Sequence, residues 1–87
     1  MRNIRFHKIA IEDYNYWKNN DKTIHSKIRL LLDDISERPF TGLGKPEPLK
    51  HELHGYWSRR ITNEHRLVYK VLESEIFVIS CRYHYNK

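Results

Sequence analysis

Three apolar runs, joined by short polar links, fill most of the second half of the chain. The runs are YWSRRIT at 56–62, RLVYKVL at 66–72 and IFVISCRY at 76–83, and the links are NEH and ESE. Runs of this length that are rich in β-branched and aromatic residues are typical of strands, and short polar links join antiparallel neighbours. The sequence therefore predicts a three-stranded antiparallel meander.

The link between the second and third runs decides which side chains share a face of the sheet. A three-residue link pairs Leu72 with Ile76 and makes the pairs that follow apolar on one face. That face carries Leu67, Tyr69, Val71, Phe77, Ile79 and Cys81. A slip of one residue would exchange the two faces, so the apolar match selects this register. On the opposite face Arg66 then pairs with Arg82, and their mutual repulsion would be relieved by an anion bound between them.

The first run can join the meander in either of two phases. With an odd-length link, Trp57 and Ile61 face the core. With an even-length link, Arg60 is instead buried beside Leu67, and burial of an unpaired charge costs several kcal/mol. We therefore expect the odd link. Provided that the third strand extends to residue 84, the open face of the sheet then carries Arg60, Arg66, Arg82 and His84.

Ahead of the meander, the apolar residues change to a helical period. Over residues 8–20 the apolar positions are Ala10, Ile11, Tyr14 and Trp17. Over residues 21–38 they are Ile24, Ile28, Leu31, Leu32 and Ile35, which gives the clearest helical stripe in the chain. Asp21 is a suitable N-cap for this second helix, and Pro39 ends it. A helical hairpin is predicted, preceded by a short strand at 3–7.

A loop is predicted at residues 39–48, PFTGLGKPEP, which hold all three prolines and two of the three glycines. The part after it is too short to fold alone, so residues 1–87 are predicted to form a single α+β domain. Cys81 is the one cysteine, which excludes an intramolecular disulfide and a cysteine metal cluster. The charged start is unlike a signal peptide, and no run approaches the ~18 apolar residues of a membrane span. A cytoplasmic protein is expected.

The charge balance points to an anionic partner without identifying it. Sixteen Lys and Arg against eleven Asp and Glu give a net charge of +5. A basic surface favours nucleic acid, an acidic protein or a membrane surface. A protein that is merely soluble and basic fits the charge equally well, so the choice depends on individual residues.

The arginines and the histidine of the predicted open face suggest phosphate chemistry. The guanidinium fork matches phosphate oxygens, and histidine moves protons near neutral pH. Glu47 lies between Pro46 and Pro48, which stiffen the loop, and could supply a base. Glu47 would take the proton from an RNA 2′-OH, the oxygen would attack the phosphorus, and His84 would protonate the departing 5′-oxygen. These parts suit a metal-free ribonuclease.

Each of these residues also has a simpler interpretation. Glu47 can be a solvated loop residue and His84 a frayed terminal residue. Neighbours on a strand face opposite ways, so one of Arg59 and Arg60 is expected to be solvated. Tyr83 and Trp57 are expected in the core rather than in a site. The remaining histidines lack metal-ligand spacing and are expected at the surface; they are His7, His25, His51, His54 and His65.

A family resemblance adds to this interpretation. The segment GKPEPLKHELHGYWSRRITNEHRLVYKV, followed by CRYHY, resembles the YoeB-type toxins of bacterial toxin–antitoxin systems, within the wider RelE-like toxins. EDYNYW and RPFTGLGKPEPLKH resemble the same family, so the match covers nearly all 87 residues. The resemblance implies a small antiparallel sheet with two helices packed on one face. It also implies an mRNA interferase, a metal-free endoribonuclease without a cofactor that cuts mRNA in the ribosomal A site.

The resemblance also implies roles for single residues. Glu47 stands at the position of the family's general base, and Arg66 at its phosphate-stabilising arginine. His84 stands at the general acid, and Tyr85 at the tyrosine that closes the family's active tail. Lys50 and Arg60 stand at basic positions implicated in substrate or ribosome contact, and the face analysis adds Arg82 to these RNA-binding candidates.

The partners implied are the 70S ribosome with its mRNA and a YefM-like antitoxin encoded beside the toxin. The antitoxin would fold a disordered acidic segment over the basic face. A homodimer is also open. The alternative from a different class is a basic module that binds the ribosome and blocks translation without cutting. A third interpretation, a degenerate family member kept as a binding partner or repressor subunit, is disfavoured because the motif residues are intact.

Overall fold

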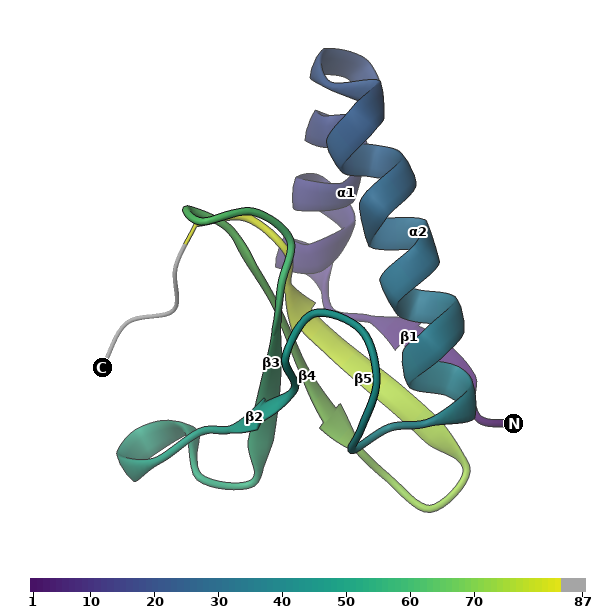
Figure 1. Ribbon diagram of the computed structural model, residues 1–87, viewed down its shortest axis with the longest axis vertical. Helices are drawn as coiled ribbons and strands as arrows, with labels where there is room; N and C mark the ends of the chain where they lie inside the picture. Colours follow the sequence, from purple (N-terminus) through teal and green to yellow (C-terminus); the bar gives the residue numbers. More distant parts are fainter. Residues whose placement is uncertain (84–87) are drawn as a thin grey trace.

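A computed structural model describes residues 1–83, in which two helices pack on one side of a five-stranded sheet (Figure 1). The helices are α1 (Lys8–Asn20) and α2 (Lys22–Glu37). The strands are β1 (Asn3–Phe6), β2 (Glu47–Pro48), β3 (Tyr56–Arg60), β4 (Arg66–Val71) and β5 (Glu75–Ser80), and a short 3-10 turn, η1 (His51–Leu53), follows β2. Within these residues neither helix is long and apolar enough to cross a membrane.

The predicted α+β class and the helical hairpin are confirmed. Asp21 caps α2, and its carboxylate accepts hydrogen bonds from the Thr23 and Ile24 N–H groups. The sheet order is β1-β5-β4-β3-β2, and β3, β4 and β5 are antiparallel neighbours as the meander predicts. β2 also pairs antiparallel with β3, although its two residues were predicted to lie in a loop. β1 pairs in parallel with β5, so the complete sheet is mixed. Alternation within a single run carries no information about a partner strand seventy residues away, so this pairing was not predicted.

The register between β4 and β5 departs from the prediction near the turn. Tyr69 pairs with Val78 instead of the expected Ile79. A bulge between Val68 and Tyr69 then restores the predicted alignment, in which Val68 pairs with Ser80. A bulge adds one residue to one strand, so a count that assumes strict alternation cannot detect it.

The core consequently takes different residues from β5 than expected. Ile76 and Val78 are fully buried, whereas Phe77 and Ile79 were predicted there. Phe77 instead pairs with Arg5 of β1 on the other face, where the guanidinium lies 4.2 Å from its ring centroid. The rest of the buried cluster consists of residues that were predicted to face the core, including Ile61 and Cys81. Ile11 of α1 was predicted on the apolar stripe but is 47% exposed.

The odd link between β3 and β4 is confirmed. Arg60 pairs with Arg66, and Ser58 pairs with Val68, so these four side chains share the face away from the helices. Alternation then turns Arg59 towards the helices, directly beside Leu67. The predicted register keeps Arg60 out of that place, and the fold buries its neighbour Arg59 there instead.

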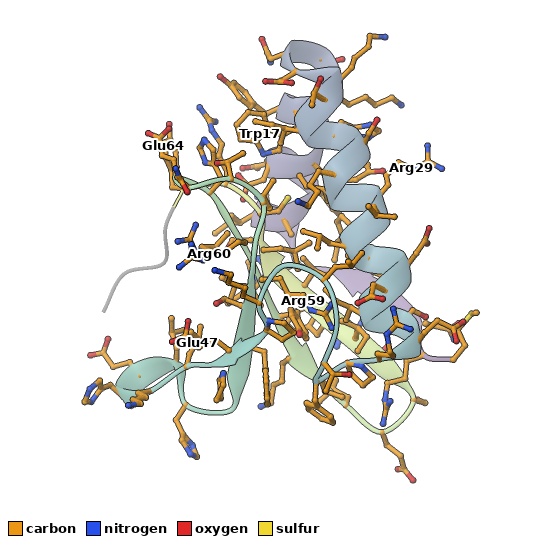
Figure 2. The ribbon with its side chains drawn as sticks, viewed as in Figure 1. Trp17, Arg29, Glu47, Arg59, Arg60 and Glu64 are labelled. Carbon is orange, nitrogen blue, oxygen red and sulfur yellow. The ribbon has the colours of Figure 1, made fainter. Side chains whose placement is uncertain are left out.

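Arg59 is fully buried and forms an ion pair with Asp34 of α2 (Figure 2). Its Nη1 donates to the Asp34 carboxylate at 2.6 Å, and its Nε donates to the Tyr69 hydroxyl at 3.1 Å. The other donated bonds reach the loop after α2, at the carbonyl oxygens of Arg38, Thr41 and Leu43. The Tyr69 hydroxyl donates in turn to the Pro39 carbonyl at 2.8 Å. One guanidinium therefore joins α2, the loop and the sheet.

Asp34 is held in its charged form by this cluster. Burial acts to raise the pKa of its carboxyl group, but hydrogen bonds from the Leu43 N–H and from the Arg59 and Arg38 guanidinium groups outweigh burial. The net result is a pKa below the ordinary value. Both charges of the pair are thus satisfied in the interior, which is the condition under which a buried ion pair is tolerated.

We expect Arg59→Met to lower the free energy of unfolding by about 3–5 kcal/mol, because it leaves the Asp34 charge buried without its partner. Arg60→Met, the same substitution one residue along β3, changes an exposed side chain and should alter stability by no more than about 0.5 kcal/mol. Urea denaturation of both variants measures the difference. Equal effects of the two substitutions would contradict the structural role of Arg59.

A second prediction concerns pH. Because the folded-state pKa of Asp34 is lowered, its contribution to stability is present above the unfolded value of about 3.9 and is lost as the pH falls through the folded value. Asp34→Asn should therefore destabilise the protein most at pH ~7, and its difference from the wild type should shrink progressively as the pH is lowered below about 4. Asp33→Asn, at the exposed neighbouring position on α2, should differ little from the wild type in stability at any pH in this range. Denaturant unfolding across this pH range tests this.

Candidate functional site

The face of the sheet away from the helices brings together three of the predicted site residues. Glu47 of β2 pairs with Ser58 of β3, so its side chain points to the same face as Ser58. Arg60 and Arg66 form the next pair of positions on that face. Figure 2 shows Glu47 and Arg60 on the same side of the sheet, away from the helices. Adjacent rows on one face are separated by about 7 Å along the strands, within reach of long side chains.

The two facing arginines are a different pair from the one predicted. Arg60 lies directly opposite Arg66. Arg82, the expected partner of Arg66, lies beyond the end of β5, and its guanidinium stacks 3.5 Å from the ring centroid of Tyr16 on α1. The prediction for Arg82 assumed that the third strand extends past residue 80, and this was wrong. Arg60 and Arg66 keep the predicted property, because two like charges facing each other form a place for an anion.

The guanidinium group of Arg66 is fixed by the turn that precedes it. Its Nη1 donates to three backbone carbonyl oxygens, those of Thr62, Asn63 and His65, at 2.8, 3.1 and 3.2 Å. The side chain is 8% exposed, whereas Arg60 is exposed. A guanidinium held in this way needs little reorganisation to meet a charge that develops nearby.

The loop that carries Glu47 is held against β3 by close backbone contact. The Gly44 carbonyl accepts the Arg60 N–H at 2.7 Å. Gly44 has φ of +79°, and a Cβ atom there would lie 3.0 Å from a Leu31 methyl carbon and 3.1 Å from the Arg60 carbonyl oxygen. A side chain at this position would therefore push the loop away from the strand. Leu49 is buried and bonds to the Tyr56 carbonyl, which fixes the segment on the other side of Glu47.

Among residues 1–83, three residues other than glycine have a left-handed backbone, and all of them flank candidate site residues. Lys45 has φ of 54° and His51 has φ of 59°, on either side of the segment that holds Glu47 and Lys50. Tyr83 has φ of 64° and is the last described residue, directly before His84 in the sequence. Such conformations cost free energy and cluster at functional sites. These three residues therefore mark the two segments in which the sequence predicts the base and the acid.

The remaining predicted site residues fall in two groups. Lys50 is exposed just after β2, on the segment that follows Glu47. His84 and Tyr85 lie outside the described residues. Among residues 1–83, no group of three or more His, Cys, Asp or Glu side chains could hold a metal ion.

The backbone that leads towards His84 is anchored by three side chains on the helix side. The Cys81 N–H donates to the Asp13 carboxylate at 3.0 Å, and the Trp17 indole N–H donates to the Cys81 carbonyl at 2.9 Å. The Tyr83 N–H donates to Nδ1 of His65 at 2.7 Å. We call Asp13, Trp17 and His65 the tail anchor.

Two expectations about these residues were wrong. His65 was expected at the surface but is buried, with its ring packed edge-on against Trp17. Tyr83 was expected in the core but is 56% exposed. The sequence held a signal for His65, because alternation from Leu67 and Tyr69 places it on the helix face once Arg66 is assigned to the open face. Trp57 packs against the core as expected.

Comparison with known proteins gives one consistent family. The family model described as YoeB-like toxin of bacterial type II toxin–antitoxin system matches residues 6–85. Toxin YoeB of Escherichia coli (strain K12) is 57% identical over 74 residues, which cover 85% of this chain and 88% of that protein. The structure of the YoeB/ParE toxin from Agrobacterium tumefaciens superposes with a TM-score of 0.93 at 46% identity, covering 95% of this chain and 99% of that chain.

The YoeB of Staphylococcus aureus is similar in two solved assemblies. Its dimer gives a TM-score of 0.90 at 50% identity, covering 97% of this chain and 98% of that chain. Its heterotetrameric complex with YefM gives 0.89 at 50% identity, covering 98% and 99%. Coverage is nearly complete on both sides, so the likeness extends over the whole fold described above.

The geometry at the tail anchor predicts the reactivity of Cys81. Burial, together with the nearby Asp13 carboxylate, raises the pKa of this thiol to about 12. Because the thiolate is the reactive form, we expect Cys81 to resist alkylation by iodoacetamide at pH ~8 in the native protein. It should react fully in urea, which serves as the control. Rapid modification of the native protein would contradict the packing at this position.

Proposed function

Because this chain belongs to the YoeB-like toxins of bacterial type II toxin–antitoxin systems, we propose that it acts as a ribosome-dependent endoribonuclease that needs no metal ion. In this proposal the protein enters the ribosomal A site and cuts the mRNA there, which stops translation. The observation that carries the proposal is the shared face of Glu47, Arg60 and Arg66, in which a carboxylate lies one row from two facing arginines.

The reaction follows from the chemistry of these groups. Glu47 takes the proton from the 2′-OH of the nucleotide before the cut, and the oxygen attacks the adjacent phosphorus. The bond to the 5′-oxygen of the next nucleotide breaks, and a 2′,3′-cyclic phosphate remains. Arg66, held by the turn 62–65, stabilises the negative charge that develops on the phosphoryl oxygens. DNA lacks the 2′-OH, so the reaction is confined to RNA.

The last proton is assigned by family resemblance. His84 protonates the leaving 5′-oxygen, and Tyr85 stands at the position of the tyrosine that closes the family's active tail; both lie outside the described residues. Lys50 and Arg60 are exposed and contact the RNA backbone or the ribosome. Contacts between these side chains and RNA phosphates add affinity without conferring base specificity.

We propose a YefM-like antitoxin as the protein partner. The Staphylococcus aureus YoeB has been solved in complex with YefM, and this chain is 50% identical to it. An acidic segment that orders on binding would cover the face of Glu47 and the two arginines, drawn there by the net charge of +5. The same Staphylococcus aureus protein has been solved as a dimer, so self-association is proposed as a second assembly.

The test is primer extension on a defined mRNA in a purified translation system. Wild-type protein should produce a new 5′ end at the A-site codon, and only when ribosomes are present. Glu47→Gln should lower the cleavage rate by roughly 100-fold or more, because it removes the base without changing the size of the side chain. Glu52→Gln, an exposed carboxylate on η1, should cut like the wild type and serves as the matched control.

Two outcomes would separate the proposal from its alternative. If translation stalls while the mRNA stays intact, and Glu47→Gln is as inhibitory as the wild type, the protein blocks the ribosome by binding alone. If Glu47→Gln cuts at the wild-type rate, the protein is a nuclease but Glu47 is not its base. Either result would overturn the mechanism described above.

A further inference from the structure

In the turn between β3 and β4, two consecutive residues, His65 and Arg66, form hydrogen bonds with the backbone of Tyr83. Nδ1 of His65 accepts the Tyr83 N–H at 2.7 Å, and the Arg66 N–H donates to the Tyr83 carbonyl at 3.0 Å. Both polar groups of the Tyr83 backbone are therefore bound by consecutive residues. His65 is 8% exposed, so its bond is largely shielded from water and from competing donors.

The same turn orients the guanidinium of Arg66. Three carbonyl oxygens of the turn, including that of His65, accept hydrogen bonds from its Nη1. The Thr62 hydroxyl oxygen closes the turn by accepting the His65 N–H at 3.1 Å. The placement of Arg66 and the placement of Tyr83 thus depend on one short piece of backbone, and His65 is the residue common to both.

The ring of His65 is itself held from the helix side. It packs edge-on against Trp17 of α1, with centroids 4.7 Å apart, and the Trp17 indole N–H bonds to the Cys81 carbonyl. A fixed ring presents its Nδ1 in one direction. The contact to Tyr83 is therefore set by packing within the core and does not rely on a mobile surface side chain.

We propose that His65 is a positioning residue for RNA cleavage, because it holds the backbone of Tyr83 against the turn that orients Arg66. The inference rests on the proposed function, in which His84 supplies the last proton. His84 directly follows Tyr83 in the sequence, so the bonds that fix the Tyr83 backbone act on the start of the segment that supplies the last proton. A small displacement of a reacting group lowers the rate strongly.

The contact defines the state of the imidazole ring. Because Nδ1 accepts a hydrogen bond, its lone pair must be free, so the neutral ring carries its proton on Nε2. Nε2 then faces Glu64, whose carboxylate oxygen is 3.8 Å away. The opposite tautomer would place two N–H groups against each other at Tyr83. The tautomer of the wild-type ring is therefore a direct readout of the anchor.

Two substitutions separate the hydrogen bond from the packing of the ring. His65→Asn keeps an acceptor oxygen close to the position of Nδ1 but loses the ring that packs on Trp17. His65→Phe keeps an aromatic ring but has no acceptor. A role in packing alone predicts that Phe is the better replacement, whereas the positioning role predicts that Asn is the better one for cleavage.

The experiment measures single-turnover mRNA cleavage and amide hydrogen exchange on the same purified variants. We expect His65→Phe to exchange the Tyr83 amide roughly tenfold faster and to cut about 10- to 100-fold more slowly than the wild type. His65→Asn should recover most of the cleavage rate even where its melting temperature is the lower of the two. The Cys81 amide, which bonds to Asp13, should stay protected in both variants and serves as the internal control.

Several results would overturn the inference. One is that His65→Phe cuts mRNA at the wild-type rate and leaves the exchange rate of the Tyr83 amide unchanged. Another is that His65→Phe and His65→Asn lower the cleavage rate equally. A third is that ¹H–¹⁵N correlation NMR finds the proton of the wild-type His65 ring on Nδ1. The NMR measurement needs no variant, so it tests the hydrogen bond between the Tyr83 N–H and Nδ1 of His65 even if His65→Phe fails to fold. If the wild type does not cut mRNA at all, the proposed function fails. Amide exchange at Tyr83 and the tautomer of His65 still test whether His65 holds the Tyr83 backbone.

Discussion

A single buried guanidinium, that of Arg59, holds the loop that carries Glu47. Its bonds reach α2 through Asp34, the sheet through Tyr69, and the loop through three backbone carbonyl groups. Without it, the loop after α2 would have to satisfy those carbonyls in another way, since buried backbone groups are rarely left unpaired. The open face can present a carboxylate at a fixed place because an arginine on the other side of the same strand fixes the loop.

Arg59 and Arg60 show how strand alternation divides this work between the two faces. The two residues are chemically identical and adjacent, yet one is fully buried and paired while the other is exposed beside Arg66. Repulsion between Arg60 and Arg66 is a local cost that an anionic ligand removes. Exchanging the two faces would bury Arg60 and turn Arg59 away from Asp34, so the register of β3 is as important for the site as the residues themselves.

Local pattern predicted much of this arrangement. Helical spacing gave both helices, and alternation with the cost of a buried charge put Arg60 and Arg66 on one face. Two features depend on contacts distant in sequence and were missed, namely the parallel pairing of β1 with β5 and the Asp34 partner of Arg59. The bulge at Val68 and Tyr69 was missed because it interrupts the strict alternation on which the register was predicted. Arg82 was misplaced because the run of strand-like residues continues past the point where β5 ends.

The loop before Glu47 and residues 81–83 before His84 are therefore fixed in the same manner, by hydrogen bonds from their backbone to side chains. Each is held by polar side chains in the layer between the helices and the sheet, namely Arg59 for the loop and Asp13, Trp17 and His65 for residues 81–83. Apolar residues in these places could give comparable stability, as replacements of buried ion pairs in other proteins demonstrate. What apolar packing does not supply is directional bonding to a particular backbone group. In a chain of 87 residues with a small core, such directional bonds serve to place the site, and binding of a partner can add the stability that they do not provide.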